Sequence, residues 1–174
     1  MIIIRPARKR DISRIIALAD VTFGEDYESR KEILECLDDY VVLCLDDDLA
    51  GYASTAFYEP YDGMEADEAL AYIESVSVYP EHRGLGFGTI LVGVCTAKLI
   101  KEGADSIECV AAIWSDLEES RPPLAGSLER NQFQSTQYLS HYWKDDDPSD
   151  YQCRACGSKD CQCDAMLYRR RINT

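Results

Sequence analysis

The sequence predicts an α/β fold of the α+β kind, in which helices flank a mixed, mostly antiparallel sheet of about seven strands. Segments rich in β-branched and aromatic residues recur along the chain, and stretches with helical apolar spacing separate them. With 174 residues, 46% of them hydrophobic, the chain is long enough for one well-buried core. We therefore expect a single domain over residues 1–174.

The first third of the chain predicts a strand, two helices and a hairpin. Residues 2–7 form an apolar strand, and Asp11 is a suitable N-cap for a helix that carries Ile12, Ile15 and Ile16 on one face. A second helix is expected over 27–37. The strands 40–45 and 49–58 then flank an acidic turn.

The middle of the chain predicts a strand, a helix and a strand. The strand 70–79 ends at Pro80, an amphipathic helix follows from Phe87 to a stop at Gly103, and the next strand covers 106–114. Such a unit has parallel strands and a right-handed crossover.

The last third predicts a short helix over 124–130 and a closing hairpin with strands 133–143 and 165–172. A cysteine-rich loop at about residues 145–164 lies between the two strands of this hairpin.

The formal net charge of -14 argues against binding to nucleic acid, which requires clustered Lys and Arg. No run of 18 apolar residues occurs, and basic residues follow the short apolar start, so we expect a cytoplasmic protein without membrane contact. A cationic partner suits the acidity, although acidity also serves solubility alone.

The segment "HRGLGFG" places three glycines at alternate positions ahead of the predicted helix. Free backbone N–H groups at a helix N-terminus suit a phosphate or pyrophosphate, and Arg83 can add a charge-assisted hydrogen bond. The alternative is a tight turn with close helix packing. A P-loop would need Gly-Lys-Ser/Thr, and a dinucleotide-binding fingerprint would lie near the first strand.

The stretch "VSVYPEHRGLGFGTIL", from Val76 to Leu91, resembles the strand and Arg-x-x-Gly-x-Gly loop of the GNAT superfamily of N-acetyltransferases. The expected order of elements is also similar nearly from end to end. The resemblance implies a splayed parallel pair at the centre of the sheet and acetyl-CoA as co-substrate.

The resemblance implies that the strand backbone pairs with the pantetheine arm of acetyl-CoA and that the glycine turn holds its pyrophosphate. The corresponding residues here are Val76, Ser77 and Val78 on the strand, and Arg83, Gly84, Leu85, Gly86, Phe87, Gly88 and Thr89 in the turn.

Two carboxylates are candidates for the general base that an attacking amine needs. Glu74 is expected on one strand face with Tyr72, Val76 and Val78, and Glu108 on the next strand lies where similar ribosomal-protein N-terminal acetyltransferases place a glutamate. Either residue could instead be solvated or belong to a structural salt bridge.

The general acid is less clear from the sequence. Many members of the family carry a Tyr in the short helix before the final hairpin, where this chain has Leu128. Tyr138 or Tyr142 could replace it, or water could protonate the departing thiolate.

Four cysteines lie close together in "CRACGSKDCQC", and their thiolates suit a structural Zn²⁺. They are Cys153, Cys156, Cys161 and Cys163. An iron–sulfur cluster and disulfides are the alternatives. Since the spacing is short, His141 or a second subunit of a homodimer could contribute a ligand. Cys36, Cys44, Cys95 and Cys109 are expected in the core.

The leading hypothesis is an acetyl-CoA-dependent N-acetyltransferase that acetylates a primary amine of a basic protein or peptide, at its N-terminus or a lysine, by direct attack. One alternative acceptor is a small polycation such as a polyamine or an aminoglycoside. Another alternative is a non-catalytic acyl-CoA-binding module that uses the cysteine loop to contact a partner.

Overall fold

A computed structural model of the chain describes residues 1–57, 69–118, 120–144, 152–157 and 161–172. Its elements are β1 (Ile2–Pro6), α1 (Ile12–Thr22), α2 (Arg30–Glu35), β2 (Tyr40–Leu45), β3 (Asp48–Phe57), β4 (Leu70–Val78), α3 (Phe87–Lys101), β5 (Ser106–Ile113), α4 (Ala125–Arg130), β6 (Gln134–Leu139) and β7 (Asp164–Arg171). The acidic segments 59–69 and 144–151, whose composition indicates loops, fall almost entirely outside the described residues.

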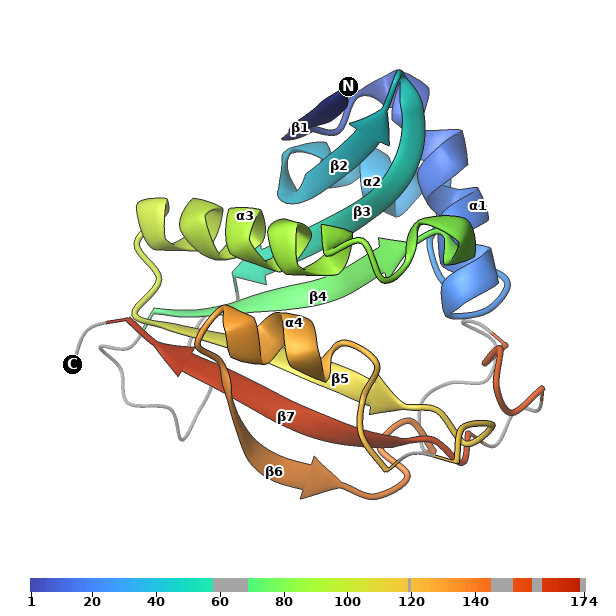
Figure 1. Cartoon of the computed structure of the whole chain (residues 1–174), viewed down its shortest axis with the longest axis vertical. Coiled ribbons are helices and arrows are strands. Elements are labelled where there is room, and N and C mark those ends of the chain that lie inside the picture. The colour runs from blue at the N-terminus through green and yellow to red at the C-terminus, as the bar shows by residue number, and fades with distance from the viewer. Residues whose placement is uncertain (58–68, 119, 145–151, 158–160, 173–174) are drawn as a thin grey trace.

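The seven strands form one sheet in the order β1-β2-β3-β4-β5-β7-β6 (Figure 1). Every neighbouring pair is antiparallel except β4 and β5, which are parallel. The crossover between these two strands is α3, as the strand, helix and strand pattern predicts. The predicted fold class is therefore confirmed.

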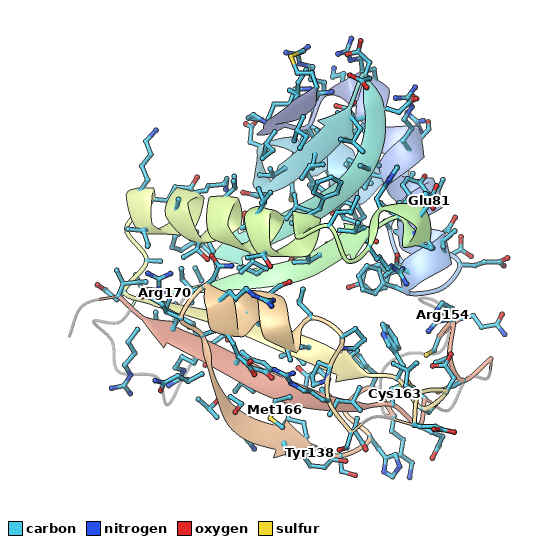
Figure 2. All side chains as sticks on the ribbon, viewed as in Figure 1. Glu81, Tyr138, Arg154, Cys163, Met166 and Arg170 are labelled. Atoms are coloured by element: carbon cyan, nitrogen blue, oxygen red, sulfur yellow. The ribbon has the colours of Figure 1, made fainter. Side chains whose placement is uncertain are left out.

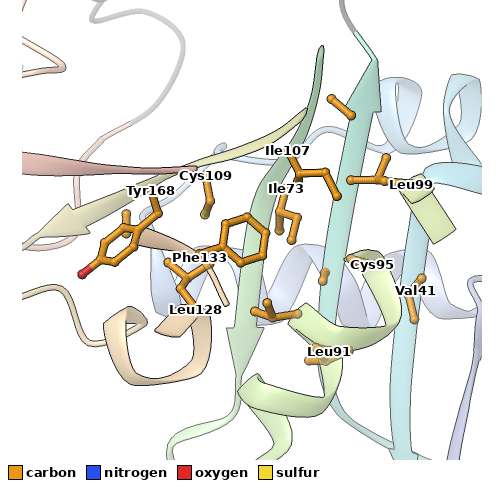
Figure 3. Packing of buried hydrophobic residues seen from close by; sticks show 14 of the residues in the cluster. Val41, Ile73, Leu91, Cys95, Leu99, Ile107, Cys109, Leu128, Phe133 and Tyr168 are labelled. Atoms are coloured by element: carbon orange, nitrogen blue, oxygen red, sulfur yellow. The ribbon is translucent and has the colours of Figure 1, made fainter. Parts of the chain in front are cut away.

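Two apolar cores lie on opposite faces of the sheet. The larger core lies between the sheet and the helices α3 and α4, and Leu91, Ile107 and Leu128 are completely buried in it (Figure 3). The smaller core lies under α1 and α2, around Ile15 and Tyr52. The helices therefore form one layer on each side of the sheet.

Helix α2 is shorter than predicted, because its N-terminus is set by a capping box. Ser29 accepts a hydrogen bond from the N–H of Glu32, and the Glu32 side chain accepts one from the N–H of Ser29. Residues 27 and 28 therefore remain in the preceding loop. The sequence carries the Ser-x-x-Glu pattern that is typical of a capping box.

Three further expectations need correction. Asp11 precedes α1 as expected, but its carboxylate binds Arg5 at 2.7 Å and does not cap the helix. Cys36 is exposed at the end of α2, whereas Cys44, Cys95 and Cys109 are buried as expected. Strand β6 ends at Leu139, so the expected strand 133–143 is too long.

None of the helices in the described part of the chain combines the length and the apolarity that a membrane span requires.

Candidate functional site

The centre of the sheet opens where β4 and β5 separate. Their parallel pairing is limited to three positions and ends at Tyr72 opposite Glu108. Beyond this point β4 continues to Val78 and β5 to Ile113 without pairing to each other. The facing edges of residues 73–78 and 109–113 thus carry backbone groups with no strand partner, which an extended ligand can bind.

A β-bulge in β4 lies two residues beyond Tyr72, the last residue of β4 that pairs with β5. Ser54 of β3 is opposite Ser75, whereas the next residue, Thr55, is opposite Ile73, so Glu74 is the extra residue. A bulge bends its strand and reverses the side-chain alternation beyond it. The bulge therefore lies where the pairing of β4 with β5 stops.

The reversal corrects the expected face of Glu74. Ile73 before the bulge and both Val76 and Val78 after it pack toward the α3 core. Ser77 instead faces α1, where its hydroxyl bonds to that of Thr22. The side chains of Val76, Ser77 and Val78 thus pack against α3 or bond to α1, and their backbone faces the opening.

The glycine turn connects the end of β4 to the N-terminus of α3. Gly84 and Gly86 have φ values of +76° and +84°, a left-handed conformation that other residues rarely adopt. A Cβ atom at either position would meet nothing within 4 Å, so conformation alone requires glycine there. Gly86 is also the N-cap of α3 and offers no side chain to the first N–H groups of the helix.

The beginning of α3 is held against α4. A Cβ atom on Gly88 would lie 3.1 Å from the hydroxyl oxygen of Ser127, so glycine permits this close approach. Asn131 donates hydrogen bonds from Nδ2 to the carbonyls of Thr89 and Ser127, at 3.0 and 2.8 Å. Arg83 donates from Nε to the carbonyl of Val78 at 3.0 Å, which fastens the glycine turn to β4.

Glu108 forms an ion pair with Arg169, the residue opposite it on β7. Glu108 is 5% exposed, and its Oε1 accepts hydrogen bonds from both Nε, at 2.7 Å, and Nη2 of Arg169. Glu108 therefore links β5 to β7 through a salt bridge, which is the structural role that the sequence left open for this residue. The side chain of Glu74 on β4 is exposed, whereas that of Glu108 is buried.

A second carboxylate near the opening, Glu28, has no signal in the sequence. It is 8% exposed in the loop after α1 and accepts hydrogen bonds from the hydroxyls of Tyr40, at 2.7 Å, and Tyr52, at 3.3 Å. Burial raises the pKa of Glu28 to about 7, and the nearby negative charge of Glu74 contributes to this. Glu74 thus contributes negative potential on the α1 side of the sheet, and Glu28 adds to it as it ionises near pH 7.

Tyr138, one of the two candidate tyrosines, lies two strands away from this opening. Tyr138 is on the edge strand β6, separated from β5 by β7, and its hydroxyl donates to Asp164. It is opposite Met166, which packs toward the α3 core, so it lies on the sheet face opposite Glu108 (Figure 2). Tyr142 follows the end of β6 and packs edge-on against Trp143.

The four clustered cysteines converge at the ends of β5 and β7, where Figure 2 shows Cys163. Their sulfur atoms all lie within 4.8 Å of one another, and three of the separations are 3.5, 3.8 and 3.9 Å. A regular tetrahedron with Zn–S bonds of about 2.3 Å needs sulfur atoms about 3.8 Å apart. The donor set therefore fits a tetrathiolate metal site.

Hydrogen bonds around Cys156 favour the thiolate that a metal would bind. Burial opposes ionisation, but the hydroxyl of Ser115 at 3.2 Å and the N–H of Gln162 at 3.2 Å lower the pKa of Cys156 to about 7. The N–H of Ser115 also donates to the sulfur of Cys163 at 3.4 Å. Ser115, like Glu28, Asn131 and Arg169, was not indicated by the sequence, since each acts through contacts distant in the chain.

Residues 11–122 match the acetyltransferase (GNAT) family. This match spans more than half of the chain, which therefore belongs to that family. No curated protein sequence matches the chain.

Solved structures share the fold at low sequence identity. A chain of the NatC complex bound to Gag peptide and CoA aligns with a TM-score of 0.70 and 16% identity over 99% of both chains. The ribosomal-protein-alanine N-acetyltransferase of Brucella melitensis gives 0.68 and 16%, over 98% of this chain and 99% of that one. The yncA protein of Salmonella typhimurium with its cofactor acetyl-CoA gives 0.69 and 17%, over 99% and 94%.

The raised pKa of Glu28 predicts a pH-dependent stability. Between the ordinary pKa of 4.5 and about 7 the folded chain keeps a proton that the unfolded chain has lost, so the free energy of unfolding falls as the pH rises through this window. Glu28→Gln removes this loss. Relative to the variant, the wild type should lose up to about 3 kcal/mol between pH 4.5 and 8 in urea denaturation. Glu25→Gln, which changes an exposed neighbour, is the control. If the difference in free energy of unfolding between wild type and Glu28→Gln is as independent of pH as that for Glu25→Gln, the account is contradicted.

Proposed function

We propose that this chain is an acetyl-CoA-dependent N-acetyltransferase that acetylates a primary amine of a basic protein or peptide, at its N-terminus or a lysine. Family membership supports acetyl transfer. The observation that carries the proposal is the opening between β4 and β5, which leads directly into the glycine turn at the N-terminus of α3. We further propose that residues 1–174 act as one domain, with the cysteine loop inserted in the final hairpin.

The anionic part of acetyl-CoA would bind at the glycine turn. Residues 83–89 provide Arg83, a backbone free of Cβ atoms at three positions, and the positive end of the 15-residue α3. The pantetheine arm would pair with the backbone of residues 76–78. Similar proteins solved with CoA or acetyl-CoA support this choice of co-substrate.

The acceptor amine would approach from the α1 side of the sheet. Glu74 supplies negative charge there, Glu28 adds to it as it ionises near pH 7, and the half-buried Tyr27 lies next to Glu28 in the α1–α2 loop. A cationic ammonium is stabilised by carboxylates and by aromatic faces. The formal net charge of -14 extends this attraction beyond the opening. The similar NatC complex was solved with a peptide, which supports a peptide acceptor.

The chemistry is a direct displacement at the thioester. The amine nitrogen forms a bond to the acetyl carbon, the carbon–sulfur bond breaks, and the electron pair leaves on the CoA sulfur. Glu74 accepts the proton that the amine releases, directly or through water, because it is exposed beside the opening whereas Glu108 is buried. We assign neither Tyr138 nor Tyr142 to proton transfer, and water protonates the thiolate.

The two cysteines on α3 and β5 do not favour transfer through a cysteine intermediate. Burial raises the pKa of both Cys95 and Cys109, the cysteines on α3 and β5, to about 12. A nucleophilic cysteine needs a lowered pKa. Direct attack therefore fits the chain better.

We also propose that Cys153, Cys156, Cys161 and Cys163 bind one structural Zn²⁺. Four thiolates without an open position are typical of structural zinc, and this spacing does not match the usual runs of iron–sulfur proteins. The four sulfur atoms of one chain already converge, so the proposal needs no ligand from His141 or from a second subunit. A reducing cytoplasm would keep these thiols available.

Gly86→Ala should weaken acetyl-CoA binding. Gly86 and Gly103 both have positive φ values and open space around a Cβ atom, so alanine strains the backbone similarly at both positions. Gly86→Ala distorts the turn that presents N–H groups to the pyrophosphate, whereas Gly103→Ala affects the far end of α3. We expect KM for acetyl-CoA to rise about tenfold for Gly86→Ala only. Equal effects of the two variants would remove the turn from the site.

The function itself is tested by CoA release and acceptor mass across peptides, polyamines and aminoglycosides. We expect a gain of one acetyl group on basic peptides. Glu74→Gln should lower kcat by about 100-fold or more, since general-base catalysis contributes on that scale. Glu108→Gln should lower the stability and leave kcat within about tenfold of wild type, since it breaks the pair with Arg169.

Other outcomes have defined meanings. Loss of transfer in Glu108→Gln but not in Glu74→Gln would make Glu108 the base. Acetylation of polyamines or aminoglycosides alone would replace the peptide acceptor. Tight CoA binding without transfer to any acceptor would indicate a non-catalytic module.

A further inference from the structure

The turn that contains two of the clustered cysteines docks on the loop after α1. We call residues 152–157 the cysteine turn and residues 23–29 the α1 loop. The N–H of Arg154 donates to the carbonyl of Phe23 at 2.8 Å, and the N–H of Gln152 donates to the carbonyl of Glu25 at 3.3 Å. These two bonds from alternate residues join segments more than 120 residues apart in the sequence.

Gly24 allows this contact. A Cβ atom at this position would lie 1.8 Å from the carbonyl oxygen of Gln152, and the φ value of Gly24 is +138°. Only glycine permits the two backbones to approach so closely. The α1 loop is thus shaped to receive the cysteine turn.

The cysteine turn is also fastened to the end of β5. The guanidinium of Arg154 lies 5.6 Å above the ring of Trp114 and pairs with Asp116 at 3.2 Å, while Ser115 bonds to the sulfur of Cys156. Figure 2 shows Arg154 and Cys163 on the same side of the molecule, between the start of β7 and the loop after α1. The ring of Phe23 in the α1 loop lies 6.2 Å from that of Trp114.

The other attachments of the α1 loop are on the opposite side of the opening. Thr22, just before the loop, bonds to Ser77 of β4, and Glu28 bonds to Tyr40 and Tyr52 of β2 and β3. The α1 loop therefore runs from the β4 side of the sheet toward the end of β5, and the cysteine turn holds its far side.

We propose that metal binding by the four cysteines holds the α1 loop across the opening between β4 and β5 and thereby controls acceptor binding, while acetyl-CoA binding is independent of the metal. This inference rests on the proposed function only where it names the acceptor. The structural part, a metal-dependent order of the α1 loop, stands without it.

The physical reason is the small number of other interactions within the turn. Among the described residues, those of the cysteine turn form no helix or strand, and the partly buried hydrophobic residues packed against the cluster are Trp114, Trp143, Ala155 and Cys156. Ordering such a segment costs about 1–2 kcal/mol per residue in backbone entropy, which metal ligation can offset. Without metal the buried sulfur atoms lose their shared partner, and the two hydrogen bonds to the α1 loop lose their support.

The acetyl-CoA site has separate supports. The glycine turn is fixed by Arg83 on Val78, and the first turn of α3 by Asn131 of the segment after α4. Neither contact involves the cysteine turn or the α1 loop. Loss of the metal should therefore change one substrate site and leave the other.

The test compares full-length protein with one Zn²⁺ bound, the same protein after chelation, and the chelated protein with Zn²⁺ restored. Elemental analysis measures the metal, hydrogen exchange measures the order of residues 23–29 and 83–89, and steady-state kinetics measures KM for a basic peptide and for acetyl-CoA. We expect metal removal to speed exchange in residues 23–29 and to raise KM for the peptide at least about tenfold, with restoration by Zn²⁺. Exchange in residues 83–89 and KM for acetyl-CoA should stay within about twofold.

Two variants separate the metal from the docking. Cys156→Ser should reproduce the chelated state, with Cys36→Ser, an exposed cysteine outside the cluster, as its control. Gly24→Ala should raise KM for the peptide while the protein still binds one metal ion, because it blocks the docking and leaves the thiols intact. If Cys156→Ser does not fold, chelation of the wild type and Gly24→Ala still decide the matter.

The inference fails if the protein binds no metal, or if metal removal leaves both the exchange of residues 23–29 and the peptide KM unchanged. It also fails if acetyl-CoA binding is lost to the same extent. If exchange responds to the metal but no acceptor is acetylated even with metal bound, the proposed function fails and the metal-dependent order of the loop remains.

Discussion

The separation of β4 from β5 beyond Tyr72 and Glu108 is the constraint on which the rest of the molecule depends. Adjacent parallel strands normally continue their pairing, so a separation within a sheet leaves backbone groups without partners. Here a β-bulge at Glu74 lies where the pairing with β5 stops, and α3 packs against Val76 and Val78 beyond the bulge. The opening is therefore built by the fold itself, and the two candidate substrate sites lie on its α3 and α1 sides.

The two sides of the opening have opposite electrostatic character. On the α3 side the N-terminus of α3, the glycine turn and Arg83 favour an anion. On the α1 side Glu74 favours a cation, and Glu28 adds to this as it ionises near pH 7. A transfer from an anionic donor to a cationic acceptor needs this arrangement, since each substrate is drawn to its own side of the sheet. The cysteine cluster adds a third element, because it is fastened to both the loop after α1 and the end of β5.

The sequence allowed prediction of the elements whose local pattern is strong. The alternation of apolar residues, the glycine turn and the cysteine spacing identified the strands, α3 and the thiol cluster before any coordinates. The bulge at Glu74 could not be predicted, since it depends on the register between β3 and β4, and it changed the face on which Val76 and Val78 lie. Glu28 was missed for a similar reason, because only the folded sheet brings Tyr40 and Tyr52 to its carboxylate.

The account is tested most directly by amide hydrogen exchange with and without CoA. Because the gap-facing backbone of residues 73–78 has no strand partner on the β5 side, bound CoA should slow exchange in residues 73–78 and in the glycine turn, 83–89. If CoA binds but slows exchange only elsewhere in the chain, the opening between β4 and β5 is not the cofactor site and the account is wrong.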